Sequence, residues 1–136
     1  MRRNWWWVLA LLNGPLAAQG GLDAAAQRAR SAWLAHDPAA LLRGSPGVVL
    51  QIRGADPSSA IGRDQAGELL SRFFRTSVER SVEISVAREV EEGRGYVEMV
   101  RRFSISGTSE ERRETVFLGL RWWGNQWVVV ELRSAP

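Results

Sequence analysis

The chain has 136 residues, enough for one domain, with 18 basic residues, 15 acidic residues and no cysteine. The absence of cysteine excludes disulfides and thiolate chemistry, so a folded domain of this length must rely on its apolar core. Without Arg2 and Arg3, 16 basic residues face 15 acidic ones, and the net charge falls from +3 to +1. This balance gives no reason to expect a nucleic-acid partner.

The first twenty residues have the layout of a secretory signal peptide. A short basic head, MRRN, precedes the apolar run WWWVLALL, and Asn13-Gly14-Pro15 breaks that run before several small residues. The run is much shorter than the ~20 apolar residues that a membrane-spanning helix needs. We expect cleavage after Ala18 or Gly20 and export of residues 21–136 to the periplasm or the outside medium, with no membrane span in the mature chain. Attachment to the envelope through an uncleaved N-terminus is the alternative.

The first half of the domain predicts two helices, a short helix and one strand. Apolar residues recur at helical intervals over residues 21–36 and again over residues 63–75, where the amphipathic pattern is clearest. Asp37-Pro38 is typical of the start of a short helix, with Asp37 as its N-cap. Residues 48–54, VVLQIRG, alternate and are rich in β-branched side chains, which predicts a strand.

The rest of the chain predicts a meander of long antiparallel strands. Four segments alternate apolar and polar residues, and turns that contain glycine separate them. The segments are SVEISVAREVEE, YVEMVRRFSIS, ERRETVFLGLRWW and QWVVVELR. Together with the helices, this order predicts the α+β class, with the helices gathered on one side of a curved antiparallel sheet.

Two details of register decide which of these residues face the core. Gly124-Asn125 is typical of a two-residue hairpin turn, which places Trp122 opposite Trp127 and Leu118 opposite Glu131. We interpret the tryptophans as core residues and a hairpin clamp rather than as a platform for ligand stacking. In the segment SVEISVAREVEE, the predicted apolar face holds Val82, Ile84, Val86 and Val90.

Both faces of the C-terminal hairpin are rich in apolar side chains. A sheet of this kind needs cover on both sides, and the predicted helices cover only one. The other face must meet a second subunit or a ligand, or remain as a sizeable exposed patch. We therefore expect a homodimer that forms through the sheet face.

Three segments carry a resemblance to a known superfamily. GRDQAGELLSRFF, YVEMVRRF and ETVFLGLRWWGNQWVVVELR resemble the nuclear transport factor 2-like (cystatin-like α+β) superfamily, and within it a group of small exported bacterial proteins of unknown function. The resemblance covers most of residues 23–133. It implies a cone, in which a strongly bent antiparallel sheet wraps around N-terminal helices and leaves a hollow at the wide end. It also implies relatives that are isomerase-like or dehydratase-like enzymes and many that only bind, so the fold does not choose a function.

Few residues offer catalytic chemistry. The isomerase-like members use a carboxylate base with a tyrosine, but the only tyrosine here, Tyr96, begins a strand instead of lying on the first helix. The candidate proton carriers are His36, at the end of the first helix, and Glu131, in the last strand. For each we favour a structural interpretation: a helix-dipole partner for His36 and an ion pair with Arg133 for Glu131. With one histidine and no cysteine, we expect no metal site and no cofactor.

Several arginines lie next to one another on neighbouring predicted strands. Arg101-Arg102 and Arg112-Arg113 share these strands with Glu98, Glu111 and Glu114. Mixed charges of this kind predict cross-strand pairing on a solvent-exposed face.

The favoured hypothesis is an exported, non-enzymatic binding or scaffold domain, dimeric, that engages an apolar small molecule or an envelope protein. Five apolar residues are the candidates for lining its hollow. They are Trp33, Phe73, Phe74, Met99 and Phe117. The alternative hypothesis is an isomerase- or dehydratase-type enzyme that acts in the hollow, with Glu131 or His36 as proton carrier.

Overall fold

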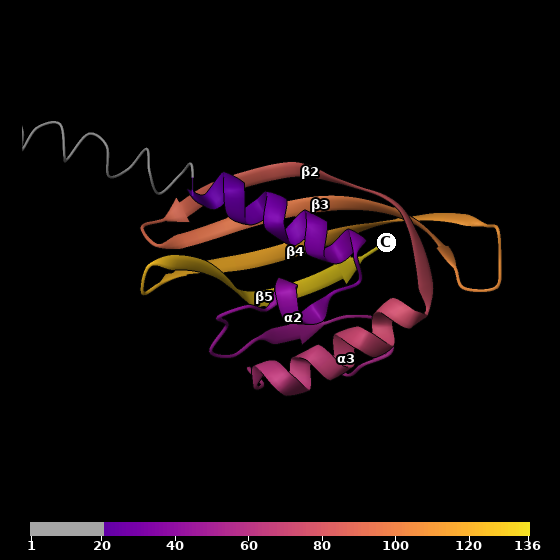
Figure 1. The fold of residues 1–136 in the computed structure, drawn as a ribbon, viewed down its shortest axis with the longest axis horizontal. Helices are drawn as coiled ribbons and strands as arrows, with labels where there is room; N and C mark the ends of the chain where they lie inside the picture. The colour runs from indigo at the N-terminus through magenta and orange to yellow at the C-terminus, as the bar shows by residue number, and fades with distance from the viewer. Residues whose placement is uncertain (1–20) are drawn as a thin grey trace, which may run out of the picture.

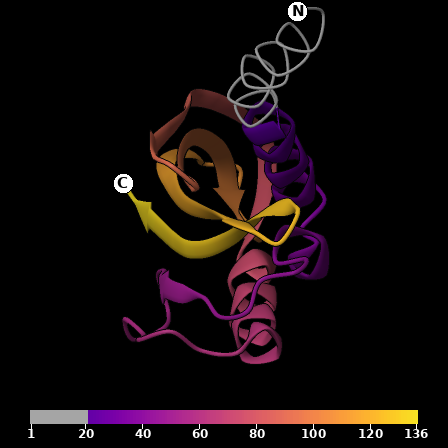
Figure 2. The ribbon, with the colours of Figure 1, turned by 90° about the vertical axis from the view of Figure 1, so that its left-hand side faces the viewer.

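A strongly curved five-stranded sheet forms most of the structure (Figures 1 and 2). The computed structural model describes residues 21–136, and the predicted signal peptide lies outside them. The strands are β1 (Val49–Gln51), β2 (Ser77–Glu91), β3 (Arg94–Ile105), β4 (Glu111–Trp123) and β5 (Gln126–Ala135). Their order in the sheet is β1-β5-β4-β3-β2, with β2 to β5 pairing as an antiparallel meander and β1 pairing parallel to β5.

The helices lie on one side of the curled sheet, which confirms the predicted α+β architecture (Figure 2). The first helix covers residues 21–34, and α2 (Pro38–Leu41) and α3 (Arg63–Arg75) follow. Asp37 caps α2 as predicted, since its carboxylate accepts a hydrogen bond from the Ala40 N–H at 3.1 Å. Within residues 21–136, no helix has the length and apolar character needed to cross a membrane.

The core lies between these helices and the concave face of the sheet. Aromatic rings from the first helix and α3 meet in its middle, with the Trp33 and Phe74 ring centroids 5.0 Å apart and those of Trp33 and Phe73 5.9 Å apart. Aliphatic side chains from the three central strands complete it. The fully buried ones include Val97, Met99, Val116, Leu118 and Leu132.

A bulge in β5 changes the predicted register of the last hairpin. Trp122 pairs with Trp127 as predicted, and their rings meet edge to face at 5.5 Å. Further from the turn the register shifts by one residue, so Gly119 pairs with Glu131 and Leu118 pairs with Leu132. The predicted pairing of Leu118 with Glu131 is therefore wrong. Because side chains alternate along a strand, the extra residue moves Glu131 to the outer face and brings Leu132 into the core.

A second register shift, in β2, has the same effect. Between Ile84 and Val86 the pairing with β3 slips, and Ala87 rather than Val86 lies opposite the buried Val97. Val86 and Val90 are therefore on the outer face, and Val90 is half-exposed. The predicted apolar face is therefore correct for Val82 and Ile84 and wrong for Val86 and Val90, because alternation alone cannot locate a bulge.

Gly95 in β3 lets the first helix approach the sheet closely. A Cβ atom at this position would lie 2.7 Å from Leu22 Cδ1 and 3.3 Å from Trp127 Cζ3. Both neighbours are buried, so neither can move aside without disturbing the core. The contact fixes the first helix against the end of the sheet that carries the β2–β3 and β4–β5 turns (Figure 1).

We predict that Gly95→Ala lowers the free energy of unfolding by about 1–3 kcal/mol, because the added methyl group overpacks this contact. Urea unfolding followed by tryptophan fluorescence measures the change. The matched control is Gly67→Ala in α3, where a Cβ meets no atom within 4 Å. The control should raise stability by roughly 0.5–1 kcal/mol through helix propensity. Equal effects of the two substitutions would contradict the close approach at Gly95.

Candidate functional site

A buried arginine lies in the middle of the helix-facing side of the sheet. Arg101 follows Val97 and Met99 in the alternation of β3, so the backbone directs its side chain into the core. Its exposed fraction is 0%. The guanidinium lies 3.8 Å from the centroid of the Phe103 ring and 5.1 Å from that of Phe73. Contacts of this kind stabilise a desolvated cation.

Two buried carboxylates balance the charge of Arg101. Glu114 lies directly opposite on β4 and accepts a hydrogen bond from Nη1 at 3.0 Å. Glu79, near the start of β2, accepts from Nε at 3.2 Å and from Nη2 at 2.6 Å. Nη2 also donates to Ser77 Oγ at 2.7 Å. Burial of a charge is very unfavourable unless it is paired and hydrogen-bonded, and these contacts supply both conditions.

The buried charges reach the surface at two ends. At one end, His36 Nε2 lies 3.1 Å from Glu79 Oε1, and the histidine side chain is 26% exposed. At the other end, Arg53 donates a hydrogen bond to Glu114, and the arginine side chain is 50% exposed. We refer to these five side chains as the ionic array. They are His36, Glu79, Arg101, Glu114 and Arg53.

The backbone of His36 is in the left-handed region, with φ of 51°. It ends the first helix, where its N–H donates to the Trp33 carbonyl at 2.9 Å, and glycine is the residue usually found in this conformation. The imidazole ring stacks on Phe74 with a centroid distance of 4.6 Å and an interplanar angle of 7°. The contacts of the imidazole ring with Phe74 and Glu79 thus stabilise a residue whose backbone conformation is unfavourable.

Burial also affects the protonation of Arg101. Removal from water lowers the pKa of its guanidinium, and the adjacent Glu79 raises that pKa and so opposes the shift. Because an arginine ordinarily titrates far above neutral pH, the side chain stays charged at neutral pH. The interior of the cone therefore contains a permanent cation. One further polar atom close by, the buried Trp33 Nε1, has no hydrogen-bond acceptor among residues 21–136.

A hollow of about 480 Å³ opens beside the Arg53 end of the ionic array. We call it the mouth hollow. Its apolar lining includes Ile52, Ala55, Pro57 and Phe103, and its charged lining consists of Arg53, Arg112, Arg113 and Glu114. Three arginines thus surround one carboxylate, and that carboxylate already binds both Arg101 and Arg53. The mouth hollow combines an apolar wall with an excess of positive charge.

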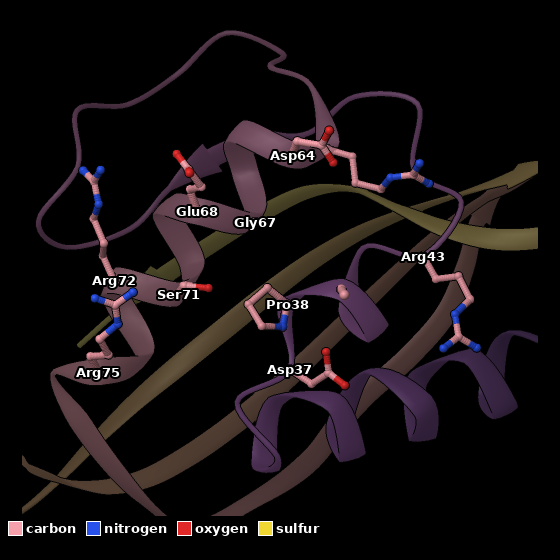
Figure 3. A pocket seen from close by; sticks show the side chains of 11 residues that line it. Asp37, Pro38, Arg43, Asp64, Gly67, Glu68, Ser71, Arg72 and Arg75 are labelled. Atoms are coloured by element: carbon pink, nitrogen blue, oxygen red, sulfur yellow. The ribbon is translucent and has the colours of Figure 1, made fainter.

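A larger groove of about 780 Å³ lies between α2 and α3 (Figure 3). Small side chains form its walls, including Pro38, Gly67 and Ser71. Charges of both signs surround it: Asp37, Arg43, Arg63, Asp64, Glu68, Arg72 and Arg75. None of the five array residues lines this groove, so it is separate from the charged interior. Its mixed charges favour no single class of ligand.

The residues predicted to line the hollow divide between the two faces of the sheet. Trp33, Phe73, Phe74 and Met99 are all buried, and the three rings contact one another at centroid distances of 5.0 to 6.1 Å. These four side chains therefore fill the interior instead of enclosing open space. Phe117 lies on the outer face, because its neighbour Val116 is the residue that pairs with Met99 on the inner face.

The two candidate proton carriers also lie apart. Glu131 is on the outer face with its side chain 48% exposed, and its Oε1 lies 3.4 Å from Arg133 Nε. This is the ion pair favoured from the sequence. His36 is joined to the interior through Glu79, a residue that the sequence analysis did not select.

The central charges of the site, Arg101 and Glu114, differ from the sequence-based expectation. That expectation placed Arg101-Arg102 on a solvent-exposed face, and this is correct only for Arg102. Cross-strand pairing of opposite charges is found for Arg101 and Glu114, and that pair is buried, whereas Arg102 lies opposite Arg113. The available signal was the alternation itself. Arg101 stands at an inward position between Met99 and Phe103, and Glu114 stands two residues before the inward Val116. A charged residue at such a position must be paired inside the fold.

On the outer face, Tyr96 and Glu98 form a short contact. The Tyr96 hydroxyl donates to Glu98 Oε1 at 2.5 Å. Burial raises the pKa of Tyr96 above its ordinary value of 10.0, and the hydrogen bond and negative charge of Glu98 raise that pKa further. Arg133 and Arg88 oppose this shift.

Comparisons with known proteins agree on the fold. No family model and no curated protein matches the sequence. A ketosteroid isomerase-like protein from Erwinia carotovora atroseptica superimposes with a TM-score of 0.70 at 18% identity, covering 87% of this chain and 97% of its own. A protein of unknown function from Shewanella oneidensis, described as NTF-2 like, gives 0.59 at 13% identity, with 86% and 98% coverage. A protein with a ketosteroid isomerase-like fold from Catenulispora acidiphila, solved with trimethylamine, gives 0.61 at 17% identity, with 82% and 84% coverage.

These likenesses confirm the fold expected from the sequence. The chain has the nuclear transport factor 2-like α+β fold, with a bent antiparallel sheet around its helices. At identities this low the comparisons show the fold alone, so the function must be inferred from the residues of the site.

We predict that Tyr96 titrates above pH 10.0, and that Glu98→Gln brings its midpoint down, because the substitution removes the nearby negative charge. The chain has one tyrosine, so phenolate absorbance reports this group alone. Because the folded-state pKa is raised, the contribution of Tyr96 to stability is fully present below pH 10.0 and is lost as the pH rises through the folded-state value. The exposed Glu83, changed to Gln, serves as the control and should leave the midpoint unchanged. A wild-type midpoint at or below 10.0 would contradict the Tyr96–Glu98 contact.

Proposed function

We propose that the mature chain is an exported, non-enzymatic binding domain that takes a small molecule at the mouth hollow and acts as a homodimer. The observation that carries this proposal is the ionic array. Its carboxylates, Glu79 and Glu114, direct their oxygens at arginine N–H groups, and Glu79 also contacts His36. A general base needs an oxygen or nitrogen that can reach a substrate proton. The carboxylate oxygens of Glu79 and Glu114 are already hydrogen-bonded inside the array, so they are poorly placed to act as that base.

The packing of the interior supports binding at the mouth over reaction in the cone. Trp33, Phe73 and Phe74 pack against one another and fill the interior of the cone. Glu131, one of the two candidate proton carriers, points away from that region. The open space lies instead at the mouth hollow, next to Arg53 and Phe103.

The lining of the mouth hollow indicates the class of small molecule. Its apolar wall suits an apolar body, and its three arginines suit a negatively charged group, with which guanidinium forms bidentate hydrogen bonds. Arg53 is the residue best placed to bind such a group, because it is half-exposed and lies 5.8 Å over the Phe103 ring. The Catenulispora acidiphila protein was solved in complex with trimethylamine, so a small molecule is held by at least one protein of the same fold.

The outer face of the sheet supports the proposed dimer. Apolar side chains are partly or half exposed on it, away from the helices: Val78, Val86, Val100 and Phe117. Glu131 and Arg133 on this face are already paired with each other. A second copy of the chain would cover the apolar side chains, and the exposed charges around them suit the polar rim of an interface.

One contact supports the alternative, an isomerase- or dehydratase-type enzyme. His36 is partly exposed and bonded to a carboxylate, and this arrangement can orient a histidine as a general base. The ring lies against Phe74, on the side of the array away from the Arg53 end.

We predict that octanoate binds the full chain and that octylamine, which has the same apolar tail and a positive head, does not. Titration calorimetry measures both. Arg53→Met should weaken octanoate binding about tenfold or more through loss of the charge-assisted hydrogen bonds. Arg43→Met is the matched control, because Arg43 lies outside the mouth hollow, and it should leave binding unchanged.

Native mass spectrometry of protein purified from its own host tests the same proposal without a chosen probe. The expected species is two copies of residues 21–136 with a bound small acid that Arg53→Met removes. A monomer would contradict the proposed dimer, and retention of residues 1–20 would contradict the proposed cleavage.

In the calorimetry, preference for octylamine over octanoate would contradict the proposed ligand class. Turnover of a bound molecule that is lost in His36→Gln would favour the enzyme.

A further inference from the structure

Two half-exposed tryptophans occupy the end of the cone opposite the mouth hollow. Trp122 is 43% exposed and Trp123 is 48% exposed, and they end β4 immediately before the turn at Gly124. We call them the aromatic tip. Large exposed rings at the extremity of a domain are unusual unless another surface covers them. One edge of the Trp122 ring packs on Trp127, which accounts for that ring as part of the hairpin clamp. The clamp does not include Trp123.

The aromatic tip is held rigidly. Gly124 has φ of 67°, and the chain turns between β4 and β5 within the two residues Gly124 and Asn125. The Trp122 N–H donates to the Gly93 carbonyl at 2.8 Å, which ties the β4–β5 turn to the β2–β3 turn. The two rings project from opposite faces of the same strand, because neighbouring residues of a strand alternate.

Two arginines lie directly opposite each other beside the tip. Arg94 on β3 pairs in register with Arg121 on β4, and like charges at such positions repel. Arg94 has an exposed partner, Glu91, at 3.4 Å. Among residues 21–136, Arg121 forms no ion pair. We call Arg94 and Arg121 the arginine pair.

A hollow of about 410 Å³ contains the arginine pair. Its remaining lining is largely small or apolar: Val90, Gly95, Tyr96, Gly119, Leu120 and Val130, with Glu131 at the side. Glu131 contacts Arg133, so its charge is already balanced. The hollow thus offers two guanidinium groups above a floor of small side chains, an arrangement that suits a phosphate group between them.

The apolar N-terminal run is attached at this same end. A Cβ on Gly21 would lie 3.6 Å from Trp127 Nε1, which places the start of the first helix beside the aromatic tip (Figure 1). The run WWWVLALL ends at Leu12, nine residues earlier in the sequence. Nine residues span at most roughly 30 Å, so a membrane that holds this run before cleavage lies within reach of the tip.

We propose that this end of the domain docks on the surface of an anionic lipid bilayer. The two tryptophan rings lie in the interfacial region, where tryptophan is enriched in membrane proteins, and the arginine pair binds a lipid phosphate. The β2–β3 and β4–β5 turns meet the membrane, and the mouth hollow, at the opposite ends of β3, β4 and β5, faces the aqueous side. This contact is independent of the proposed ligand and survives cleavage of the signal peptide.

The absence of cysteine allows a direct test on the full chain. Asn125→Cys in the β4–β5 turn and Ser109→Cys in the β3–β4 turn each accept one environment-sensitive fluorophore, and the two turns are at opposite ends of the molecule (Figure 1). On vesicles of equal phosphatidylcholine and phosphatidylglycerol, the label at position 125 should shift to the blue and be quenched by nitroxide lipids. The label at position 109 should remain in water.

Substitutions identify the groups responsible. Trp123→Ser and Arg121→Gln should each reduce vesicle binding about tenfold, through loss of buried ring area and of the phosphate contact respectively. Leu34→Ser and Arg102→Gln are matched controls, since both side chains are exposed, neither has a part in the proposed contact, and Leu34 lies at the opposite end of the first helix from the tip. Neither control should change binding.

Four results would overturn the proposal. The first is a label at position 125 that stays in water while the chain sediments with vesicles, which would assign binding to residues 1–20 alone. The second is a chain that does not bind the mixed vesicles at all. The third is equal binding to vesicles of phosphatidylcholine alone, which would show that no anionic lipid is recognised. The fourth is displacement of the chain from vesicles by soluble glycerol phosphate at equal phosphate concentration, which would make the arginine pair a site for free phosphate.

Discussion

The structure depends on one buried cation. Arg101 is the only arginine among residues 21–136 that is fully buried, and Glu79, Glu114 and Ser77 accept the hydrogen bonds that its guanidinium donates. Because a desolvated charge is tolerated only in such an environment, the strands β2, β3 and β4 must keep the register that brings these residues together. The ionic array therefore fixes the wide part of the cone, where apolar packing alone would allow a slip of one residue.

Sequence patterns predicted the elements well and the faces less well. Alternation and helical spacing predicted the helices, the meander of the last four strands and the Trp122–Trp127 pair, because these depend on local periodicity. They did not predict that β1 pairs parallel to β5 at the edge of the sheet. The bulges in β2 and β5 could not be predicted, since an inserted residue leaves no mark in the period on either side of it. That is why Glu131 was expected to pair with Leu118. Arg101 was missed because adjacent arginines were interpreted together, although their side chains point to opposite faces.

The two ends of the cone differ in chemistry. At the wide end, the ionic array reaches the mouth hollow through Arg53, and the excess of arginine there suits an acidic ligand. At the other end, exposed tryptophans and the arginine pair lie beside the start of the first helix. A domain that meets a membrane with one end and opens toward solvent with the other can present or collect a small amphipathic molecule near that membrane, with no need for catalysis.

The most direct test of the central claim is a double-mutant cycle across the Arg101–Glu114 pair, measured by urea unfolding of Arg101→Met, Glu114→Gln and the double variant. Arg101→Met alone removes the buried cation that Glu79 and Glu114 share, leaving Glu79 with His36 and Glu114 with Arg53 as their remaining partners, and should cost about 3–5 kcal/mol. The double variant should be more stable than Arg101→Met, with a coupling energy of roughly 1–3 kcal/mol. Additive effects of the two substitutions, or an Arg101→Met variant as stable as the wild type, would contradict the role assigned to the buried cation.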